Sequence, residues 1–447
     1  MLVMSNSLKS TYPIWITRQI KLIITTYIYN ITLFVIYTSI MATSYRYQGF
    51  LYYPPTLTEC LLVPLFAIIP ALLVPQQLNN LSSYFYILIY YIVYLPTIIV
   101  STLHYAGFRP EFLMLYVLLL VAMLILGIFA RIPAMALPKP KLSRLSWSMG
   151  LLALALFVYA ALVAKFGLRP PPSPLNPYGV RLAAREQGAL TGYLLRIAGN
   201  VLAPVVMVWG LFSRPPRRTM LLAASLVLFV LVYSFDGTKS TLFSPILIAS
   251  LWVVVSKRIS TSRLSMLAIM LVWVGMFIDY ALGKPMFTGI GIRRLVFVPG
   301  LLTTYYYDYF VLLNHPLYYY SHSFLRHVFP NPYDTSPAFL IGRTYFSSTF
   351  ATSANANFLA DAIANLGNVG IPLLAAIAGV YVYFMRALAR GREELSLLIG
   401  AIPIYALTNS SFFTTLLTHG LFLSTIIIWL FPYSYIYSFN KDLKKRK

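Results

Sequence analysis

Two pairs of arginines are the residues in this sequence whose types and spacing best suit chemistry. Arg181 and Arg185 are four residues apart, so they share a face if their segment is helical, and Arg293 and Arg294 are adjacent. Like charges at helical spacing repel by a few tenths of a kcal/mol, and an anion between them reverses that sign. Guanidinium groups bind phosphate oxygens through paired hydrogen bonds, so both pairs, with Lys239 as a further cation, predict a bound pyrophosphate. The alternative is that they hold lipid headgroups.

Acidic residues are scarce, with only eleven Asp and Glu in the chain. Apart from Glu393, Glu394 and Asp442, which we expect on the cytoplasmic side, no two carboxylates are close enough in sequence to form a metal-binding pair, and hard cations need several oxygen ligands. The five histidines lack metal-binding spacing, and a single cysteine, Cys60, allows no internal disulfide. We therefore expect neither a metal nor another cofactor. Glu186 and Asp308 are the candidates for a general base that takes a proton from a hydroxyl.

Tyrosines form two runs, at residues 305–307 directly before Asp308 and at residues 318–320. Tyrosine favours membrane interfaces, because one end of its side chain is polar and the other apolar. That role explains the runs without a ligand. Stacking against sugar rings in an outer groove is the alternative.

Composition determines which elements position these groups. Of 447 residues 59% are hydrophobic and 10% are charged, and apolar runs of about 20 residues, long enough to cross a bilayer, recur along the chain. We therefore predict an all-α integral membrane protein, one polytopic domain over residues 1–447 with about 12 transmembrane helices (10–14). The predicted spans are 20–41, 58–76, 81–102, 112–130, 147–165, 192–213, 219–234, 241–256, 264–281, 368–386, 394–410 and 414–436. Residues 296–313 and 336–366 are candidates for further membrane-dipping helices.

Positive charge orients this bundle, because cytoplasmic loops are rich in lysine and arginine. Alternate loops of the predicted topology are basic, which indicates that both termini are cytoplasmic. Topology also explains most of the net charge of +23, so the charge does not point to nucleic acid. The outer segments 166–191 and 282–354 nevertheless carry arginines against this trend. Such placement favours a functional role for them.

The sequence of the two outer segments resembles that of the O-antigen polymerases of the Wzy type. In the first segment Arg181 and Gly192 match the family's spacing of arginine, ten residues and glycine. The similarity runs in the same order from about residue 178 to 436. Further similar stretches are Tyr178–Glu186, Gly237–Lys239, Arg293–Pro299, Gly342–Phe346, Asn355–Phe358 and Leu366–Gly370. One departure is that Thr304 and Tyr305 stand where the family spacing places a glycine.

The resemblance implies a GT-C-like helical bundle in the bacterial inner membrane, with two large periplasmic segments. It also implies a metal-independent glycosyltransferase of lipopolysaccharide biosynthesis, which polymerises undecaprenyl-pyrophosphate-linked O-antigen repeat units at the periplasmic face. The implied partners are the lipid-linked donor and acceptor glycans, membrane lipid and a chain-length-regulating co-polymerase of the Wzz type. The implied site residues are Glu186 and Asp308 for catalysis, Arg181, Arg185, Lys239, Arg293 and Arg294 for pyrophosphate, and Tyr178, Arg343, Asn355 and Asn357 for glycan.

Two other classes of protein remain open at this level. An O-antigen ligase or a related lipid-linked glycan transferase also needs outer arginines, and it differs in its acceptor. A lipid-linked oligosaccharide flippase or transporter should carry charges within its spans and often has repeated halves. Here Arg196 is the main charge well inside a predicted span, and it sits near the outer end.

Overall fold

The computed structural model describes residues 11–135, 137–174, 176–346, 352–389 and 391–432. Within these ranges every regular element is a helix, and one isolated bridge joins Gln77 to Ser260. The first half contains α2 (Thr11–Ile36), η1 (Tyr37–Met41), α3 (Ala42–Ser44), η2 (Arg46–Gln48), α4 (Leu57–Ala71), α5 (Leu81–Ile89), η3 (Tyr90–Tyr94), α6 (Leu95–His104), α7 (Glu111–Arg131), α8 (Arg144–Phe166), α9 (Tyr178–Arg185), α10 (Ala189–Ile197), η4 (Ala198–Leu202) and α11 (Ala203–Leu211). The second half contains α12 (Arg217–Asp236), α13 (Lys239–Ser256), α14 (Thr261–Leu282), η5 (Thr288–Phe297), α15 (Val298–Tyr307), η6 (Asp308–Leu312), α16 (Pro337–Tyr345), α17 (Phe358–Leu388), α18 (Glu393–Ala406), α19 (Phe412–Leu417) and α20 (Leu421–Leu430).

The all-α membrane architecture is confirmed at the level of helix length and composition. Nine helices in the described ranges are long and apolar enough to cross a membrane, and each coincides with a predicted span. The other three predicted spans are shorter: α4 has 15 residues, α18 has 14, and the described part of 414–436 is divided between α19 and α20, with residues 433–436 outside the described ranges. The predicted segment 296–313 is helical, as part of the continuous run η5–α15–η6. Residues 336–366 contribute α16 and the first turns of α17.

Five π-helical turns interrupt helices of the described chain, although π-helix is rare in proteins. Proline explains three of them. Pro96, Pro204 and Pro299 each lie just after a π turn, and the residue four positions before each proline is inside that turn. A proline ring clashes with that carbonyl and offers it no N–H, so widening the preceding turn relieves both problems. Proline explains neither η1 nor η6, and η6 begins at Asp308.

Tyrosine hydroxyls complete the backbone hydrogen bonding of α4, which contains two internal prolines. Tyr94 donates to the Phe66 carbonyl (2.8 Å), which has lost its helical partner because Pro70 lacks an N–H. Tyr90 and Tyr86, one and two turns earlier, donate to neighbouring carbonyls of α4 at 2.6 and 2.7 Å. An unpaired carbonyl in a bilayer costs several kcal/mol, so this ladder stabilises α4.

Contacts between loops divide the bundle into two ends. At one end, which we call the basic end, Arg131 donates to the Leu72 carbonyl (2.6 Å) and Trp429 to the Pro138 carbonyl (3.0 Å). The loops meeting there, around residues 72–80, 131–144, 212–217, 257–260 and 389–392, are those predicted to be cytoplasmic. The opposite end, which we call the outer-segment end, holds both predicted outer segments. Its contacts include the bond from the Tyr45 hydroxyl to the Pro285 carbonyl (2.9 Å).

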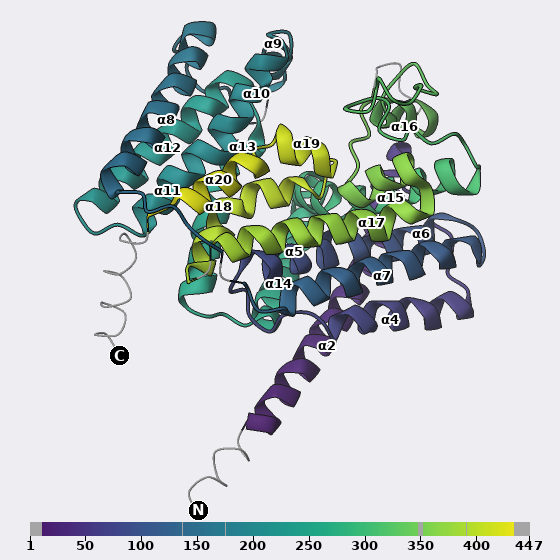
Figure 1. Ribbon diagram of the computed structural model, residues 1–447. Helices are drawn as coiled ribbons and strands as arrows, with labels where there is room; N and C mark the ends of the chain where they lie inside the picture. Colours follow the sequence, from purple (N-terminus) through teal and green to yellow (C-terminus); the bar gives the residue numbers. More distant parts are fainter. Residues whose placement is uncertain (1–10, 136, 175, 347–351, 390, 433–447) are drawn as a thin grey trace, which may run out of the picture.

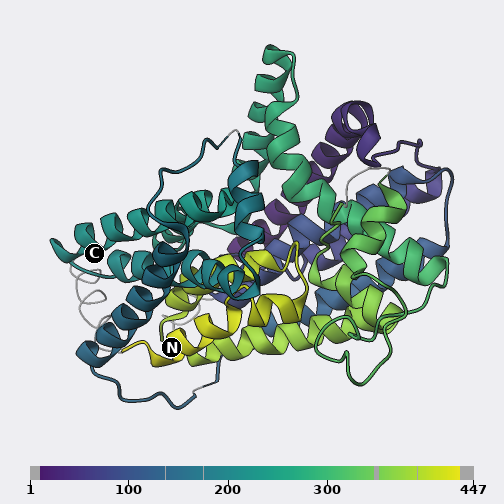
Figure 2. The same cartoon turned by 90° about the horizontal axis from the view of Figure 1, so that it is seen from above.

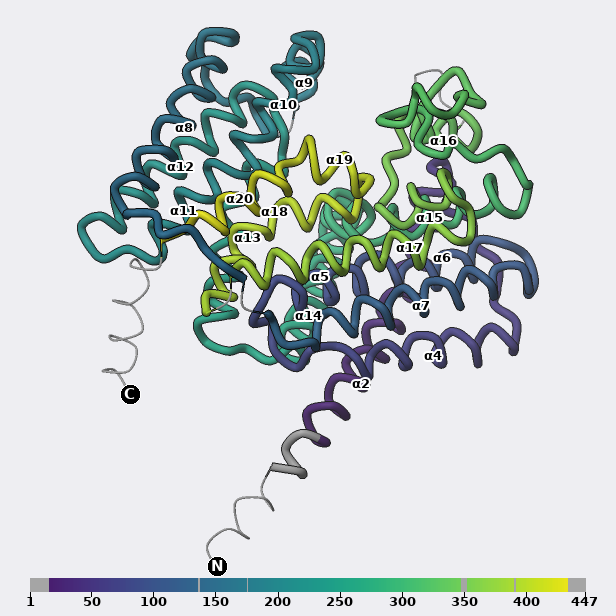
Figure 3. Tube along the Cα trace, viewed as in Figure 1, coloured from purple at the N-terminus to yellow at the C-terminus, as the bar shows by residue number. Residues whose placement is uncertain are grey.

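Two groups of helices flank α19 at the outer-segment end, as Figures 1 and 3 show. The α9 group comprises α9, α10, α12 and α13, and the α15 group comprises η5, α15, η6 and α16. Phe413 of α19 contacts Tyr320, in the loop before α16, with ring centroids 5.1 Å apart. After α19, the His419 carbonyl accepts from Asn200 of η4 (3.2 Å). The segment from α19 to residue 420 therefore contacts the loop before α16 on one side and η4, which continues α10, on the other.

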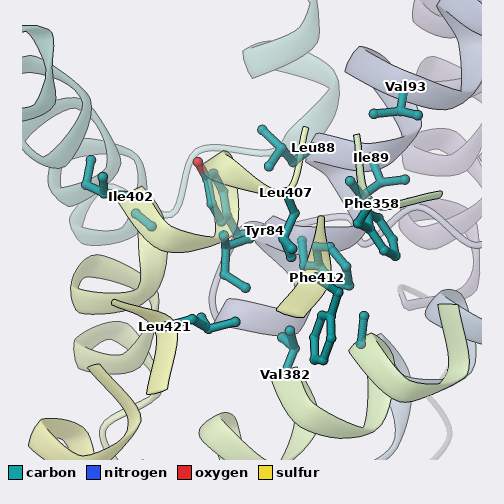
Figure 4. Close-up of a cluster of buried hydrophobic side chains, with 14 of the residues drawn as sticks. Tyr84, Leu88, Ile89, Val93, Phe358, Val382, Ile402, Leu407, Phe412 and Leu421 are labelled. Carbon is teal, nitrogen blue, oxygen red and sulfur yellow. The ribbon is translucent and has the colours of Figure 1, made fainter. Parts of the chain in front are cut away.

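A buried apolar cluster fixes α18, α19 and the start of α17 relative to α5 (Figure 4). Leu407, Phe358 and Phe412 lie together in it, all at most 2% exposed. The Phe358 N–H donates to the Leu407 carbonyl (3.0 Å), so the first turn of α17 is tied to the end of α18. At the edge of the bundle α14 packs on α2, as Figure 2 shows, and Trp273 donates to Thr32 there (3.1 Å).

Candidate functional site

The α9 group is built on the C-terminal end of α12. Gly237 ends this helix with φ +61°, and its Cα lies against Pro177, so a Cβ here would approach that proline to 3.0 Å. Arg181 donates from Nη2 to the Gly237 carbonyl (2.9 Å). Arg169 donates from Nε to the Ser234 carbonyl (2.9 Å) and from Nη2 to Phe235. Carbonyls at a helix C-terminus are unpaired and carry partial negative charge, so both arginines are held by the fold.

Three cations of the α9 group keep their charged ends available. Arg185 is exposed, four residues after Arg181, and has no partner in the described chain. Lys239 is half-buried at the first residue of α13, where the positive end of the helix dipole also favours an anion. Arg196 is half-buried on α10, close enough to Asp236 and His419 to act on both electrostatically. This surface thus carries more positive than negative charge.

The α15 group holds the second arginine pair on a π-helical segment. Arg293 lies over the ring of Tyr45 (4.8 Å to its centre), donates to the Gly289 carbonyl (3.1 Å) and bonds the Gln48 side chain. Burial lowers the pKa of Arg293, although a guanidinium stays charged at any physiological pH. Arg294 is exposed and has no hydrogen bond or ion pair in the described chain; its charge acts on Tyr405 of α18. One arginine of this pair is therefore held and one is free.

Asp279 fixes the start of η5 and thereby the position of this arginine pair. One carboxylate oxygen accepts the Phe287 N–H (2.7 Å), and the other accepts the Thr288 N–H (2.7 Å) and hydroxyl (2.6 Å). A carboxylate at a helix N-terminus satisfies N–H groups that have no helical partner. Asp279 therefore has a structural role.

The two predicted catalytic carboxylates have different surroundings. Asp308 is half-buried and accepts a hydrogen bond from the Tyr345 hydroxyl (2.6 Å), and Tyr305 stacks on Tyr345 with ring centroids 4.2 Å apart. Burial and then this carboxylate raise the pKa of Tyr345, and the same causes raise that of Tyr105 beside it. Both phenols therefore remain protonated and are able to donate to Asp308. Glu186 is exposed at the end of α9 and has no side-chain partner in the described ranges.

Of the four residues predicted to bind glycan, three are accessible. Tyr178 is 61% exposed and lies under Arg181, Arg343 forms an exposed 3.6 Å ion pair with Asp334, and Asn355 accepts from Ser353 (3.0 Å). Asn357 is fully buried and caps α17 by accepting the Leu359 and Ala360 N–H groups. Its amide donates to the Thr303 hydroxyl (2.7 Å), so the fold uses both ends of this side chain. We do not include Asn357 in the site.

The two arginine pairs lie on different supports. Helix α9 packs on α12 and α10, whereas η5 packs on α15, α14, α6 and η3. These supports form two cation groups, each suited to one phosphate-containing anion. The segment around α19 lies between them in Figure 1.

Neither a metal-binding cluster among the described residues nor a similar known protein identifies what this surface binds. The described residues contain no group of three or more His, Cys, Asp or Glu side chains placed to hold a metal ion. An apolar groove of about 330 Å³ lies between the last turns of α17 and α20, at the basic end and away from both arginine groups. Comparisons with protein-family models, curated protein sequences and solved structures found no match.

Proposed function

We propose that this protein is a membrane-embedded glycosyltransferase that polymerises undecaprenyl-pyrophosphate-linked O-antigen repeat units at the periplasmic face. The observation that carries the proposal is that each arginine pair at the outer-segment end has one member held by the fold and one free. A guanidinium held near a membrane surface without a protein partner is suited to a phosphate ligand. Two such positions match a reaction with two pyrophosphate-linked substrates. The protein partner implied is a chain-length-regulating co-polymerase of the Wzz type.

In the proposed reaction the growing chain moves from its lipid carrier to the non-reducing end of a new lipid-linked unit. The acceptor hydroxyl oxygen forms a bond to the anomeric carbon of the donor. The bond from that carbon to the pyrophosphate oxygen breaks, and its electron pair leaves with undecaprenyl pyrophosphate. The acceptor proton passes to a carboxylate of the protein. Charge accumulates on the leaving pyrophosphate, so fixed cations such as Arg185, Lys239 and Arg294 stabilise the transition state.

The glycan profile of a strain lacking this gene tests the proposal. A polymerase predicts lipopolysaccharide capped with a single repeat unit, because one unit is still transferred when polymerisation is absent. Loss of all repeat units from lipopolysaccharide would instead indicate a ligase or a flippase. The matching biochemical test is extension of purified lipid-linked repeat units by the purified protein. If the wild-type protein joins no repeat units into dimers or longer chains under any condition, the proposal is contradicted.

A further inference from the structure

A carboxylate that the sequence did not single out lies at the outer-segment end, on α17. Asp361 is on α17, one turn after its cap Asn357. Its side chain is half-buried, yet it has neither a hydrogen bond nor an ion pair within the described chain. Tyr306 of α15 and Tyr320 of the loop before α16 are the titratable groups close enough to interact with its charge. The Asp361 carboxylate is therefore partly enclosed by protein, but it is not hydrogen-bonded to any group of the described chain.

The hydroxyl groups beside Asp361 do not satisfy it. The Tyr306 hydroxyl donates to the Ala354 carbonyl (3.2 Å), so its proton is already used. The Tyr320 hydroxyl is buried and has no partner. A carboxylate that is partly removed from water and has no partner is costly. A ligand hydroxyl that donates to the accessible part of the Asp361 carboxylate would satisfy it.

The backbone at Tyr320 is strained in a way that holds this arrangement. Tyr319 and Tyr320 have φ of +50° and +58°, a region of backbone conformation that residues other than glycine rarely adopt. Such a residue persists only where surrounding contacts impose its conformation. Here the Tyr319 N–H donates to the Asn365 carbonyl (3.2 Å), and the Tyr320 N–H donates to the Asn365 side chain (2.8 Å). The fold thus holds Tyr320 over α17 at Asp361.

Asp361 also lies near the end of α18 and near α19. The first turn of α17, just before Asp361, is bonded to Leu407 at the end of α18, and Tyr405 on that helix faces the charge of Arg294. The ring of Tyr320 packs on Phe413 of α19. Figure 4 shows Phe358, Leu407 and Phe412 in one buried cluster.

We propose that Asp361 is the general base of the transfer reaction, held beside the buried ring of Tyr320. This inference rests on the proposed function. As the acceptor oxygen bonds to the donor anomeric carbon, its proton passes to the Asp361 carboxylate, and the electron pair of the broken bond leaves with the pyrophosphate. Asp308 is already bonded to Tyr345, and Glu186 is surrounded by solvent, so neither has the same free and sheltered carboxylate.

The test is Asp361→Asn in the purified protein, assayed with purified undecaprenyl-pyrophosphate-linked repeat unit. Removing a general base lowers kcat by roughly 10²- to 10⁴-fold, and we expect substrate binding and thermal stability close to wild type. Glu111→Gln is the matched control, because Glu111 is an exposed acid at the same end with no role in the site. Full kcat in Asp361→Asn, or weaker binding at unchanged kcat, overturns the proposal.

A second variant keeps the proposal testable if Asp361→Asn does not fold. Asp361→Glu retains the carboxylate in a new environment, so it should shift the acidic limb of the pH profile of kcat, whereas a structural role would leave the profile unchanged. An unshifted profile at near-normal kcat overturns the proposal. If wild type and Glu111→Gln do not extend the repeat unit either, the proposed function itself has failed. If wild type and Glu111→Gln do extend the repeat unit and Asp361→Asn extends it equally well, the role proposed for Asp361 has failed and the proposed function has not.

Discussion

The α9 group and the α15 group each hold one arginine of a pair in place, but they do so through different contacts. In the α9 group Arg169 and Arg181 are held by carbonyls at the end of α12, where the helix dipole supplies negative charge. In the α15 group Arg293 is held by the face of Tyr45 and by Gln48. Each arrangement leaves one arginine of the pair without a partner. In each pair, therefore, one arginine holds the fold and the other is left to meet a ligand.

The comparison requires both groups to lie on one side of the membrane, which labelling of single cysteines tests. In a Cys60→Ser background, we expect Ala183→Cys and Ser323→Cys to react with a membrane-impermeant maleimide on intact spheroplasts, because both positions are exposed at the outer-segment end. Lys257→Cys, exposed at the basic end, should react only after permeabilisation. Before permeabilisation, we expect full labelling at the two outer-segment positions and no labelling at position 257.

Protection of either Ala183→Cys or Ser323→Cys until permeabilisation would place the two groups on different sides and remove the shared site. Unlabelled Cys60→Ser protein sets the background, and total labelling in detergent confirms that each cysteine is reactive.

The free arginines should carry most of the function. Arg185→Ala and Arg294→Ala each remove a charge-assisted contact to substrate worth about 1.5–3 kcal/mol, which corresponds to a roughly ten- to hundredfold loss of rate or affinity. Lysine should not restore activity, because it keeps the charge and loses the planar fork. The measurement is polymerisation per folded molecule.

Arg326→Ala is the matched control for the free arginines, because Arg326 is an exposed arginine of the outer segment whose side chain bonds its neighbour His327. Full activity of both Arg185→Ala and Arg294→Ala would remove the pyrophosphate site and the main physical argument for an enzyme. Normal turnover with low protein abundance would point to lipid anchoring.

The held arginines should affect stability first. Arg181→Ala leaves the Gly237 carbonyl without its donor, and Arg293→Ala removes the contacts to Tyr45 and Gln48. We expect each to lower the free energy of unfolding by about 1–3 kcal/mol, seen as a lower Tm of the purified protein. Arg185→Ala, measured in parallel, should leave Tm unchanged, and equal Tm values for held and free variants would contradict the division between them.

The smallest expected effect is that of chelation. Arginines and Lys239 are the cations that the proposed site offers to a leaving pyrophosphate, so polymerisation should continue in EDTA. The assay is extension of purified repeat units with and without EDTA. Loss of activity that magnesium or manganese restores would show that the two groups do not supply the required charge alone.

Sequence patterns were sufficient for the long helices, because a bilayer demands about 20 apolar residues whatever the tertiary structure. These patterns failed where a single residue changes the direction of the backbone. Residues 414–436 look like one span, yet the chain turns at Gly420, with φ +88°, where Val201 lies so close that a Cβ would approach it to 2.2 Å. Hydropathy averages over such a break, because apolar residues flank it on both sides.

The site shows a similar limit. The arginine pairs were visible as pairs, but which member is held depends on contacts with residues far away in sequence, such as Gly237 and Tyr45. Asn357 was predicted to bind glycan, although an asparagine just before a long apolar run is also typical of a helix cap, its place in the structure. Asp361 gave no sequence signal, because its distinction is the absence of a bonded partner, which only tertiary structure reveals.

The π turn at Asp308 has a consequence for how this helix can change. A π turn is an α-helix that contains one additional residue, so deleting a single residue from 308–312 would let the segment close as ordinary α-helix. Because the π turn absorbs this residue locally, the residues after the deletion would keep nearly the same face, whereas a deletion from an ordinary α-helix would rotate them by about 100°. Natural variants one residue shorter at 308–312 should therefore keep both the membrane bundle and the face that residues 313–316 present to α17.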